Sequence, residues 1–577
     1  MSEGRFPDTI ELSDARRLTG INVVWSEPSA VLDLRMSDTT HVASLFSAWK
    51  AALAELCDAL NWGQPQSAWR EFKAGASFVF SAPVDRLYVA IEIARLALFT
   101  VAKRHALNLR YDEDEGPISD DDDQAIAALK TALAEERHPP TLELQAETLA
   151  RSQTFLWDDD IVSVGLGKGS QQWPADQVPD SVDWSSVHDV PVALVTGTNG
   201  KTTTVRLASR ILRAAGHRVG LSSTDWIGVD DDIIDRGDYS GPGGARTVLR
   251  DTRVDVAILE TARGGLLRRG LGVDYANAAL ITNIAEDHLG DFGSQDVGEL
   301  LNVKWVIMKA LGDGATAVLN ADDSLLREQA KTLSVPIIWF SLQSDNPLIE
   351  KHTASGGTAC ILRDETLGFL RGTRWQPLLS VDDVPITMHG VARHNCANAL
   401  AAAALCHSLG ASDEAIRQGL QEMQPNDNPG RCNVFHVDGY EVLLDFAHNP
   451  DAMAALFDIA EAHPAKRRVL CFGQAGDRTD AQIRELAQAA WSIGLDRVVI
   501  SELAEYRRGR EPGEVPRLLS EALVGAGAQT EQIHQYATEA ESLADAMNWC
   551  EPGDLVIMLA LGKARELIDH LQSRTTD

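Results

Sequence analysis

The sequence predicts an α/β fold with three parts: a central parallel-sheet domain that carries a phosphate loop, a smaller Rossmann-like carboxyl-terminal domain, and an α/β or α+β amino-terminal domain. From residue 192 onward, short apolar strands alternate with helices, which is the pattern of a parallel sheet covered on both faces. The pattern breaks at 425–430, a segment of proline, asparagine, aspartate and glycine, and then restarts. We therefore expect domains at 1–185, 190–427 and 428–577.

Length and composition narrow the class of protein. A chain of 577 residues is long enough for about three or four domains. A hydrophobic content of 44%, a charged content of 24% and a mean hydropathy of −0.14 are typical of a globular protein and exclude a disordered or fibrous one. Because the formal net charge of −32 repels phosphate backbones and anionic lipids, we expect no nucleic-acid partner and no membrane partner. A local cationic or backbone N–H site must therefore hold any anionic ligand.

The expected location is the cytoplasm. The seven cysteines are scattered and form no CxxC pair, which is typical of reduced thiols. The first residues lack the basic and apolar regions of a signal peptide. The most apolar long stretch, 87–103, contains Glu92 and Arg95, and it therefore predicts a buried helix and not a membrane span.

The first domain is expected to contain both strands and helices. An acidic stretch within 112–123 predicts a solvated loop, with a cation site as the alternative. The polar segment 165–180 predicts a linker. The expected elements are strands 30–34 and 77–80 and helices 41–60 and 85–106.

The second and third domains are expected to alternate strands with helices. In the second domain we expect strands 192–196, 219–222, 254–259, 278–282 and 315–319, and helices 201–215 and 398–408. In the third domain we expect strands 442–444, 468–472, 497–501 and 555–559, with helices between them.

The strongest local motif lies between a strand and a helix and reads Gly197-Thr-Asn-Gly200-Lys201-Thr202. Successive backbone N–H groups and a helix N-terminus can hold phosphate oxygens, the lysine adds a positive charge, and the threonine hydroxyl can bind Mg²⁺. The loop is shorter than the common phosphate-loop spacing. The alternative is a glycine-rich turn with a chance lysine, but the flanking strand and helix favour a nucleoside triphosphate site.

Further polar residues follow neighbouring strands. Glu260 comes after strand 254–259, and Asn283 and His288 come after strand 278–282. Ligands of open α/β sheets bind at the carboxyl edge of the strands. A carboxylate and an imidazole at that edge can bind a second divalent ion, although each residue alone would be interpreted as a capping or hydrogen-bonded side chain.

A basic cluster within 263–269 can bind a carboxylate through bidentate hydrogen bonds, and its alternative is a solvated loop of ion pairs.

Several motifs occur in an order that resembles the Mur ligase superfamily, over about two-thirds of the chain. The matching residues are 196–203, Glu260, 283–288, His394-Asn395-x-x-Asn398, Arg431 and Asp445-Phe-Ala-His448-Asn-Pro450. Segments 237–242, 259–272, 320–323 and 508–514 are similar to the carboxyl-terminal half of the cyanophycin synthetases. Those enzymes also contain an ATP-grasp domain. In this chain, segment 162–173 is similar to the end of their first domain, and the phosphate loop follows too soon after it for an ATP-grasp domain to fit between them. We therefore expect one ligation site, preceded by a domain that docks a substrate or polymer.

The resemblance implies a role for each matching residue. ATP would be held by Gly197, Thr198, Asn199, Gly200, Lys201, Thr202, Thr203, Asn283, Asn398, Arg431 and Asp445. Among these residues, Asn283 and Asn398 would contact the adenine, and Arg431 and Asp445 would contact phosphate and ribose. Two Mg²⁺ ions would be held by Thr202, Glu260 and His288. The catalytic residues would be Lys201, His448 and Lys304, the last at a position that is often carbamylated in the family. The substrates would contact Arg263, Arg268 and Asn449. Phe446 departs from the tyrosine of many relatives, which removes a hydroxyl.

The expected activity is that of an ATP-dependent ligase that joins a carboxylate to an amine through an acyl phosphate. The expected partners are an amino acid, arginine for example, and an acidic peptide or polymer acceptor, and the oligomeric state stays open. Two alternatives belong to other classes: a non-catalytic nucleotide-binding subunit of a ligase complex, and a nucleotide-driven switch or transporter ATPase.

Overall fold

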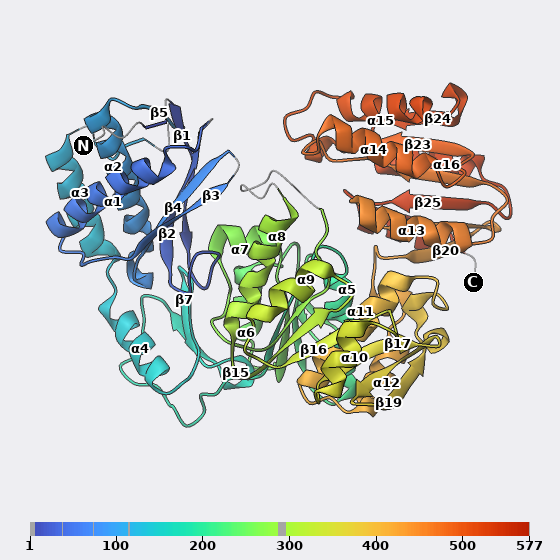
Figure 1. The fold of residues 1–577 in the computed structure, drawn as a ribbon, viewed down its shortest axis with the longest axis horizontal. Coiled ribbons are helices and arrows are strands. Elements are labelled where there is room, and N and C mark those ends of the chain that lie inside the picture. Colours follow the sequence, from blue (N-terminus) through green and yellow to red (C-terminus); the bar gives the residue numbers. More distant parts are fainter. Residues whose placement is uncertain are drawn as a thin grey trace.

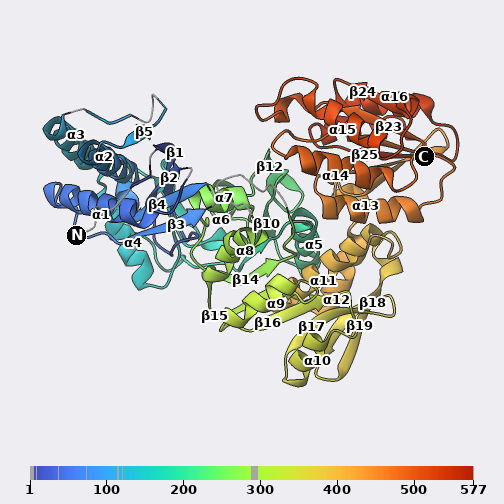
Figure 2. The ribbon, with the colours of Figure 1, turned by 45° about the horizontal axis from the view of Figure 1, so that its top comes forward.

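The computed structural model describes residues 6–7, 9–36, 38–72, 74–112, 116–119, 121–286 and 296–575. The chain folds into three successive parts, with the central part between the other two (Figures 1 and 2). Within these ranges, no helix is long and apolar enough to cross a membrane. All seven cysteines are free thiols, as expected.

The amino-terminal part is a sheet with helices on one face. Along β4, Phe78 and Phe80 point into the core against Trp49, whereas Ser77 points to the opposite face, because side chains alternate along a strand. The sheet has the order β3 (Ser67–Phe72), β4 (Gly75–Ser81), β2 (Ser29–Arg35), β1 (Thr9–Leu18) and β5 (Asn108–Arg110). Its helices are α1 (Val42–Ala59), α2 (Leu87–His105) and α3 (Asp122–Glu136).

Two expectations for this part were wrong in detail. The end of the acidic stretch is helical: Asp121 caps α3 and accepts a hydrogen bond from the Gln124 N–H at 2.9 Å, since carboxylates stabilise a helix N-terminus. Residues 113–115 and 120 of that stretch lie outside the described residues. The expected linker 165–180 instead contributes an edge strand to a small antiparallel sheet, and its glycines form close turns. After α4 (Pro139–Ala150), this sheet consists of β6 (Phe155–Trp157), β7 (Ile161–Val164) and β8 (Gln171–Pro174).

The central sheet is parallel from β10 to β17 and antiparallel at both ends, which agrees with the expected alternation of strands and helices. The described strands have the order β12 (Asp232–Arg236), β11 (Trp226–Val229), β10 (Val219–Ser222), β13 (Val256–Glu260), β9 (Val192–Thr196), β14 (Ala276–Ile281), β15 (Leu311–Asn320), β16 (Ile337–Ser341), β17 (Thr358–Arg363), β18 (Thr366–Arg371) and β19 (Arg374–Ser380).

Helices cover both faces of this sheet and bury an apolar core on each. One face carries α5 (Lys201–Ala214), α11 (Arg393–Ser408) and α12 (Asp413–Glu422). The other face carries α6 (Pro242–Leu249), α7 (Arg263–Arg269), α8 (Val297–Lys304), α9 (Ser324–Gln329) and α10 (Pro347–Ala354).

The carboxyl-terminal part is a second α/β layer structure, as expected. Its sheet is parallel except for β20 and has the order β20 (Asn433–Val437), β21 (Tyr440–Asp445), β25 (Leu555–Leu559), β22 (Arg468–Phe472), β23 (Arg497–Ser501) and β24 (Ile533–Tyr536). The helices are α13 (Pro450–Ala462), α14 (Asp480–Trp491) and α15 (Glu514–Gly525) on one face, and α16 (Glu539–Trp549) and α17 (Ala564–Gln572) on the other.

Candidate active site

The phosphate loop joins β9 to α5, as the sequence predicts. Gly197 and Gly200 have φ angles of 149° and 85°, values that favour glycine. A Cβ at Gly200 would lie 2.1 Å from Asn398 Oδ1, so only glycine fits there. Lys201 is the first residue of α5, and its Nζ donates to the carbonyl oxygens of Gly197 at 3.1 Å and Thr198 at 3.0 Å. The loop thus presents a helix N-terminus and an ammonium group on one side.

Glu260, at the end of β13, is the centre of a hydroxyl network beside this loop. The Thr202 hydroxyl donates to its two carboxylate oxygens at 3.0 and 3.2 Å. Thr224 donates through its hydroxyl at 2.6 Å and through its backbone N–H at 3.2 Å. The side chain is 1% exposed, and it makes no ion pair with any residue described in the structure. Because a buried carboxylate is costly without a positive partner, these residues fit a divalent cation.

Mg²⁺ takes few protein ligands and fills its coordination shell with phosphate oxygens and water. A site with only Thr202 and Glu260 as protein ligands is consistent with this coordination. The described ranges contain no group of three or more His, Cys, Asp or Glu side chains that could hold a metal ion. His288, the other expected metal ligand, lies outside the described residues.

Lys304 ends α8 and lies against the same loop. Its side chain is 4% exposed, and Nζ donates to the Gly197 carbonyl oxygen at 2.9 Å. Two lysines that are 103 residues apart in the sequence therefore bind one carbonyl oxygen of the phosphate loop.

The two asparagines expected at the adenine both contact the phosphate loop or its helix. Asn283 accepts a hydrogen bond from the Asn199 N–H at 2.9 Å and donates to the Asn199 carbonyl at 3.2 Å. Asn398 accepts from the Thr204 hydroxyl at 3.4 Å and donates to Asn395 at 3.1 Å. Both side chains hold the loop in its shape, and a contact with adenine stays a prediction.

The carboxyl-terminal part reaches the phosphate loop through an amide pair. Asn449 Nδ2 donates to Asn199 Oδ1 at 2.9 Å, and Asn199 Nδ2 donates to Asn449 Oδ1 at 3.2 Å. Asn449 is fully buried, and its Oδ1 also accepts from the Ala452 N–H, which caps α13. The neighbouring His448 Nδ1 lies 3.0 Å from the Phe446 carbonyl oxygen. Of the two residues expected at the amine, Asn449 therefore contacts the phosphate loop, and His448 directly precedes Asn449 in the sequence.

Arg431 and Asp445 lie beside the segment that connects the two domains. The Arg431 guanidinium stacks over the Phe446 ring at 4.6 Å. Asp445 accepts from the Cys432 N–H at 2.8 Å. Burial lowers the pKa of the adjacent His394, which keeps that imidazole neutral near pH 7.

The expected substrate arginines lie on α7, three to eight residues after Glu260. Arg263 begins the helix and is half-buried, whereas Arg268 is exposed in its last turn. The two arginines therefore lie near opposite ends of the helix.

Three residues of the site were not predicted. Thr224 follows β10 at the same sheet edge as Glu260, so the position of strand ends was a usable signal. Arg206, on α5, donates to Asn428 at 2.7 Å, and Asn428 donates to the Thr203 hydroxyl at 3.1 Å. Burial lowers the pKa of Arg206 to about 10, so it stays cationic near pH 7. No local signal marks this pair, because its partners are over 200 residues apart.

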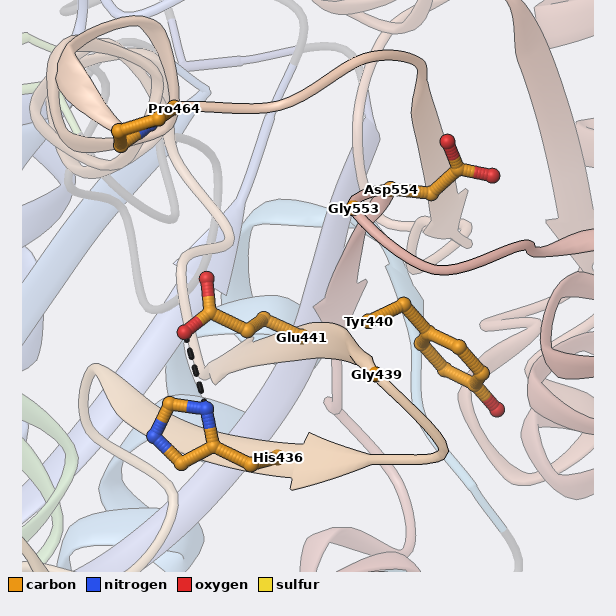
Figure 3. A pocket seen from close by; sticks show the side chains of 7 residues that line it. All are labelled: His436, Gly439, Tyr440, Glu441, Pro464, Gly553 and Asp554. Carbon is orange, nitrogen blue, oxygen red and sulfur yellow. Dashed lines mark ion pairs between the residues drawn. The ribbon is translucent and has the colours of Figure 1, made fainter.

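A pocket elsewhere in the carboxyl-terminal part is separate from this site (Figure 3). Its lining includes Glu441, which pairs with His436 at 2.9 Å, and Asp554. These residues lie near the first residues of β21 and β25, whereas Asp445 ends β21. The pocket therefore lies at the opposite end of the sheet from the phosphate loop.

Together, the fold and site define a nucleotide-binding α/β protein with a phosphate loop and a second α/β domain that contacts it. Residues 195–406 match the family model of the Mur ligase middle domain, and residues 430–562 match that of the Mur ligase, glutamate ligase domain. The chain belongs to the Mur ligase superfamily through these two domains.

Several proteins of known name are similar to parts of this chain. A cyanophycin synthetase of Synechocystis sp. is 36% identical over 385 residues, which are 66% of this chain and 43% of that protein. A UDP-N-acetylmuramoyl-L-alanyl-D-glutamate–2,6-diaminopimelate ligase of Bacillus velezensis is 25% identical over 395 residues, 66% of this chain and 75% of that one. The solved structure of E. coli FolC in complex with DHPP and ADP has a TM-score of 0.49 at 20% identity, over 67% of this chain and 89% of that one. The chain spans less than half the length of the cyanophycin synthetases that it matches.

Proposed function

We propose that this protein is an ATP-dependent ligase that joins a carboxylate to the amine of an amino acid. The observation that carries the proposal is the convergence of Lys201 and Lys304 on the Gly197 carbonyl oxygen, beside a Glu260 carboxylate that is buried and bonded to the Thr202 hydroxyl. This arrangement supplies positive charge and a cation site where a triphosphate and a second anion meet. The relatives' names, cyanophycin synthetase and a diaminopimelate ligase, support an amide-forming reaction.

The proposed reaction has two steps. A carboxylate oxygen of the acceptor attacks the γ-phosphorus of ATP, the bond to the β-phosphate oxygen breaks, and ADP leaves. The amine nitrogen then attacks the acyl carbon, phosphate leaves, and the amine loses a proton to a base. Activation is required because a carboxylate is a poor acyl donor at neutral pH. Holding both substrates in place and excluding water supply much of the rate enhancement.

Each step uses residues of this chain. Lys201 and the loop N–H groups would bind phosphate oxygens, and a bound divalent ion would neutralise their charge while held by Thr202 and Glu260, with His288 as a further ligand. Arg263 and Arg268 would bind the acceptor carboxylate, and His448 and Asn449 would position the amine. Asn283 and Asn398 would contact adenine, and Arg431 and Asp445 would contact phosphate and ribose.

Lys304 would act either as an ammonium group or, after carbamylation, as an anion that binds metal. If it is carbamylated, the lost activity of Lys304→Ala returns when a short carboxylate such as acetate is added. If acetate restores nothing, the carbamate is excluded.

The domain assignment belongs to the same proposal. Residues 190–427 would bind ATP, 428–577 would close over it, and 1–185 would dock an acidic peptide or polymer acceptor.

The test measures ADP and phosphate formed by the full chain with ATP, Mg²⁺, a panel of amino acids and a panel of acidic peptides. We expect Lys201→Ala to lower kcat by about 10²–10³-fold, the effect of removing one stabilising charge from a reacting phosphate. Lys331→Ala is the matched control, because this exposed lysine forms a surface ion pair with Glu328. Transfer of ¹⁸O from a labelled acceptor carboxylate to phosphate would establish the acyl phosphate. The proposal is refuted if no combination of acceptor and donor in these panels leads to ADP formation.

A further inference from the structure

The amino-terminal sheet has a polar face that packs toward the catalytic domain. Helices α1–α3 cover one face, and the opposite face carries Arg16, Asp33 and Ser77, all of them buried. Arg16 Nε donates to the Leu267 carbonyl of α7 at 2.9 Å, so α7 lies against this face. Both ribbon views place the sheet beside α7 and α8 (Figures 1 and 2).

Most polar groups on this face are paired with one another. Arg16 bonds to Asp33 Oδ2 at 2.5 Å and to Asp14 at 2.7 Å. The Ser77 hydroxyl donates to Asp33 Oδ1 at 2.6 Å. Both carboxylate oxygens of Asp33 are therefore already engaged.

Arg70 is the exception. It lies on β3 directly opposite Ser77, which in turn lies opposite Asp33, so its side chain shares their face. It is half-buried, its Nε is buried without a hydrogen-bond partner, and its guanidinium makes no hydrogen bond or ion pair with any residue in the described ranges. Burial lowers its pKa, and the charges of Asp33 and Glu299 raise it.

The missing partner is informative because carboxylates are abundant in this protein. The chain has 84 acidic residues for 52 lysines and arginines, and yet this arginine is left without one at a domain interface. An arginine fork matches a carboxylate through two parallel hydrogen bonds. The arrangement fits an anion supplied from outside the chain.

We propose that Arg70 binds a carboxylate of the acceptor at a distance from the carboxylate that is activated, so that the acceptor is an acidic peptide that extends from the phosphate loop to the amino-terminal sheet. This inference rests on the proposed function. It makes Arg70 a specificity-determining residue for the length and charge of the acceptor.

Helix α8 sets the length of that acceptor. Glu299 in its first turn lies near Arg70, and Lys304 at its end bonds to the phosphate loop. Five residues at about 1.5 Å each separate them by roughly 8 Å along the axis. Since an extended peptide advances about 3.3 Å per residue, an acceptor of about three residues spans the interval.

The experiment uses the full-length protein and a ladder of aspartate peptides of one to five residues as acceptors. We expect the KM for the acceptor to fall about tenfold when the peptide reaches three or four residues. We expect Arg70→Gln to remove this decrease in KM while kcat and the KM for ATP stay within twofold. Arg70→Lys keeps the charge without the fork and retains part of the decrease. Arg104→Gln is the control, because this exposed arginine pairs with Glu55 on the helical side of the same domain.

Stability distinguishes recognition from a structural role. Because Arg70 makes no hydrogen bond or ion pair with any described residue, we expect its replacement by glutamine to leave Tm unchanged or higher, whereas the loss of a structural residue would lower Tm. An unstable Arg70→Gln variant therefore contradicts the inference.

A binding measurement separates this inference from the proposed function. Fluorescent tetra-aspartate and tetra-asparagine are titrated against the protein with a non-hydrolysable ATP analogue. Tighter binding of tetra-aspartate that Arg70→Gln removes supports the inference, even if no acceptor gives ADP and the proposed function fails. The inference is overturned, and the proposed function stands, if acceptors are turned over and Arg70→Gln changes neither the dependence of KM on peptide length nor the affinity for tetra-aspartate.

Discussion

Glu260 shows how a single buried carboxylate can organise the hydroxyl groups around it. Its two oxygens accept hydrogen bonds from two threonines, Thr202 in the first turn of α5 and Thr224 in the turn between β10 and β11. These hydroxyls satisfy the buried carboxylate, and they fix the direction in which its oxygens point. The Thr224 hydroxyl, at 2.6 Å, makes the shorter of these bonds.

We therefore predict that Thr224→Val lowers kcat about tenfold and raises the Mg²⁺ concentration required for half-maximal activity. The substitution keeps the side-chain shape but leaves a buried carboxylate oxygen with one donor fewer, which costs about 1–3 kcal/mol. The measurement is ADP formation against Mg²⁺ concentration. Thr247→Val is the matched control, because that exposed hydroxyl bonds only within its own helix, at the Gly243 carbonyl. An unchanged Mg²⁺ requirement would show that Thr224 does not position Glu260.

At the scale of elements, the strands and their carboxyl edge were predictable from sequence. The sequence placed Lys201 and Glu260 at the same sheet edge because Lys201 begins the helix after strand β9 and Glu260 ends strand β13. The segment 165–180 was wrongly predicted to be a linker. Gly165 and Gly167 take positive φ angles between packed strands, and composition alone does not distinguish this role from a linker. The Asn199–Asn449 pair was not predictable, since its geometry depends on how two domains dock across 250 residues.

That amide pair connects the phosphate loop to α13. We predict that Asn449→Ser and Asn449→Ala each lower kcat about tenfold, because both remove the amide that orients the carboxyl-terminal domain over the loop, and a loss near 1.4 kcal/mol corresponds to a factor of ten. Serine still caps α13, so only alanine is expected to lower the free energy of unfolding, by about 1 kcal/mol.

The two variants are compared by ADP formation and by urea unfolding, together with Asn199→Ala, which breaks the pair and leaves the cap intact. Full activity in Asn199→Ala and Asn449→Ser would mean that the amide pair does not take part in closing the site.

At the scale of the molecule, the two outer domains are joined to the centre in different ways. The amino-terminal part is held by two buried arginines, Arg246 of α6 and Arg250 at its C-cap, which both bond to Asp158. The carboxyl-terminal part is joined through a connecting segment and a small set of side chains, among them Asn428 and Asn449. A domain held by few polar contacts can move during a catalytic cycle, whereas a buried ionic joint keeps its partner fixed. The structure therefore favours a fixed amino-terminal domain and a moving carboxyl-terminal domain.

The last prediction concerns the ionic contact of Arg246 and Arg250 with Asp158. Asp158→Asn removes the one carboxylate that two buried guanidinium groups share, and leaving buried charges without a partner costs about 3 kcal/mol, at the low end for buried pairs because the Asp158 side chain is 34% exposed. We expect amide hydrogen exchange in β7, which contributes the Ser163 hydroxyl to Arg250, to accelerate about 100-fold, while the KM for ATP is unchanged. Glu55→Gln, which breaks an exposed pair with Arg104 in the same domain, should cost at most about 1 kcal/mol and leave β7 protected. If β7 keeps its protection in Asp158→Asn, the joint between the two domains does not depend on this ion pair.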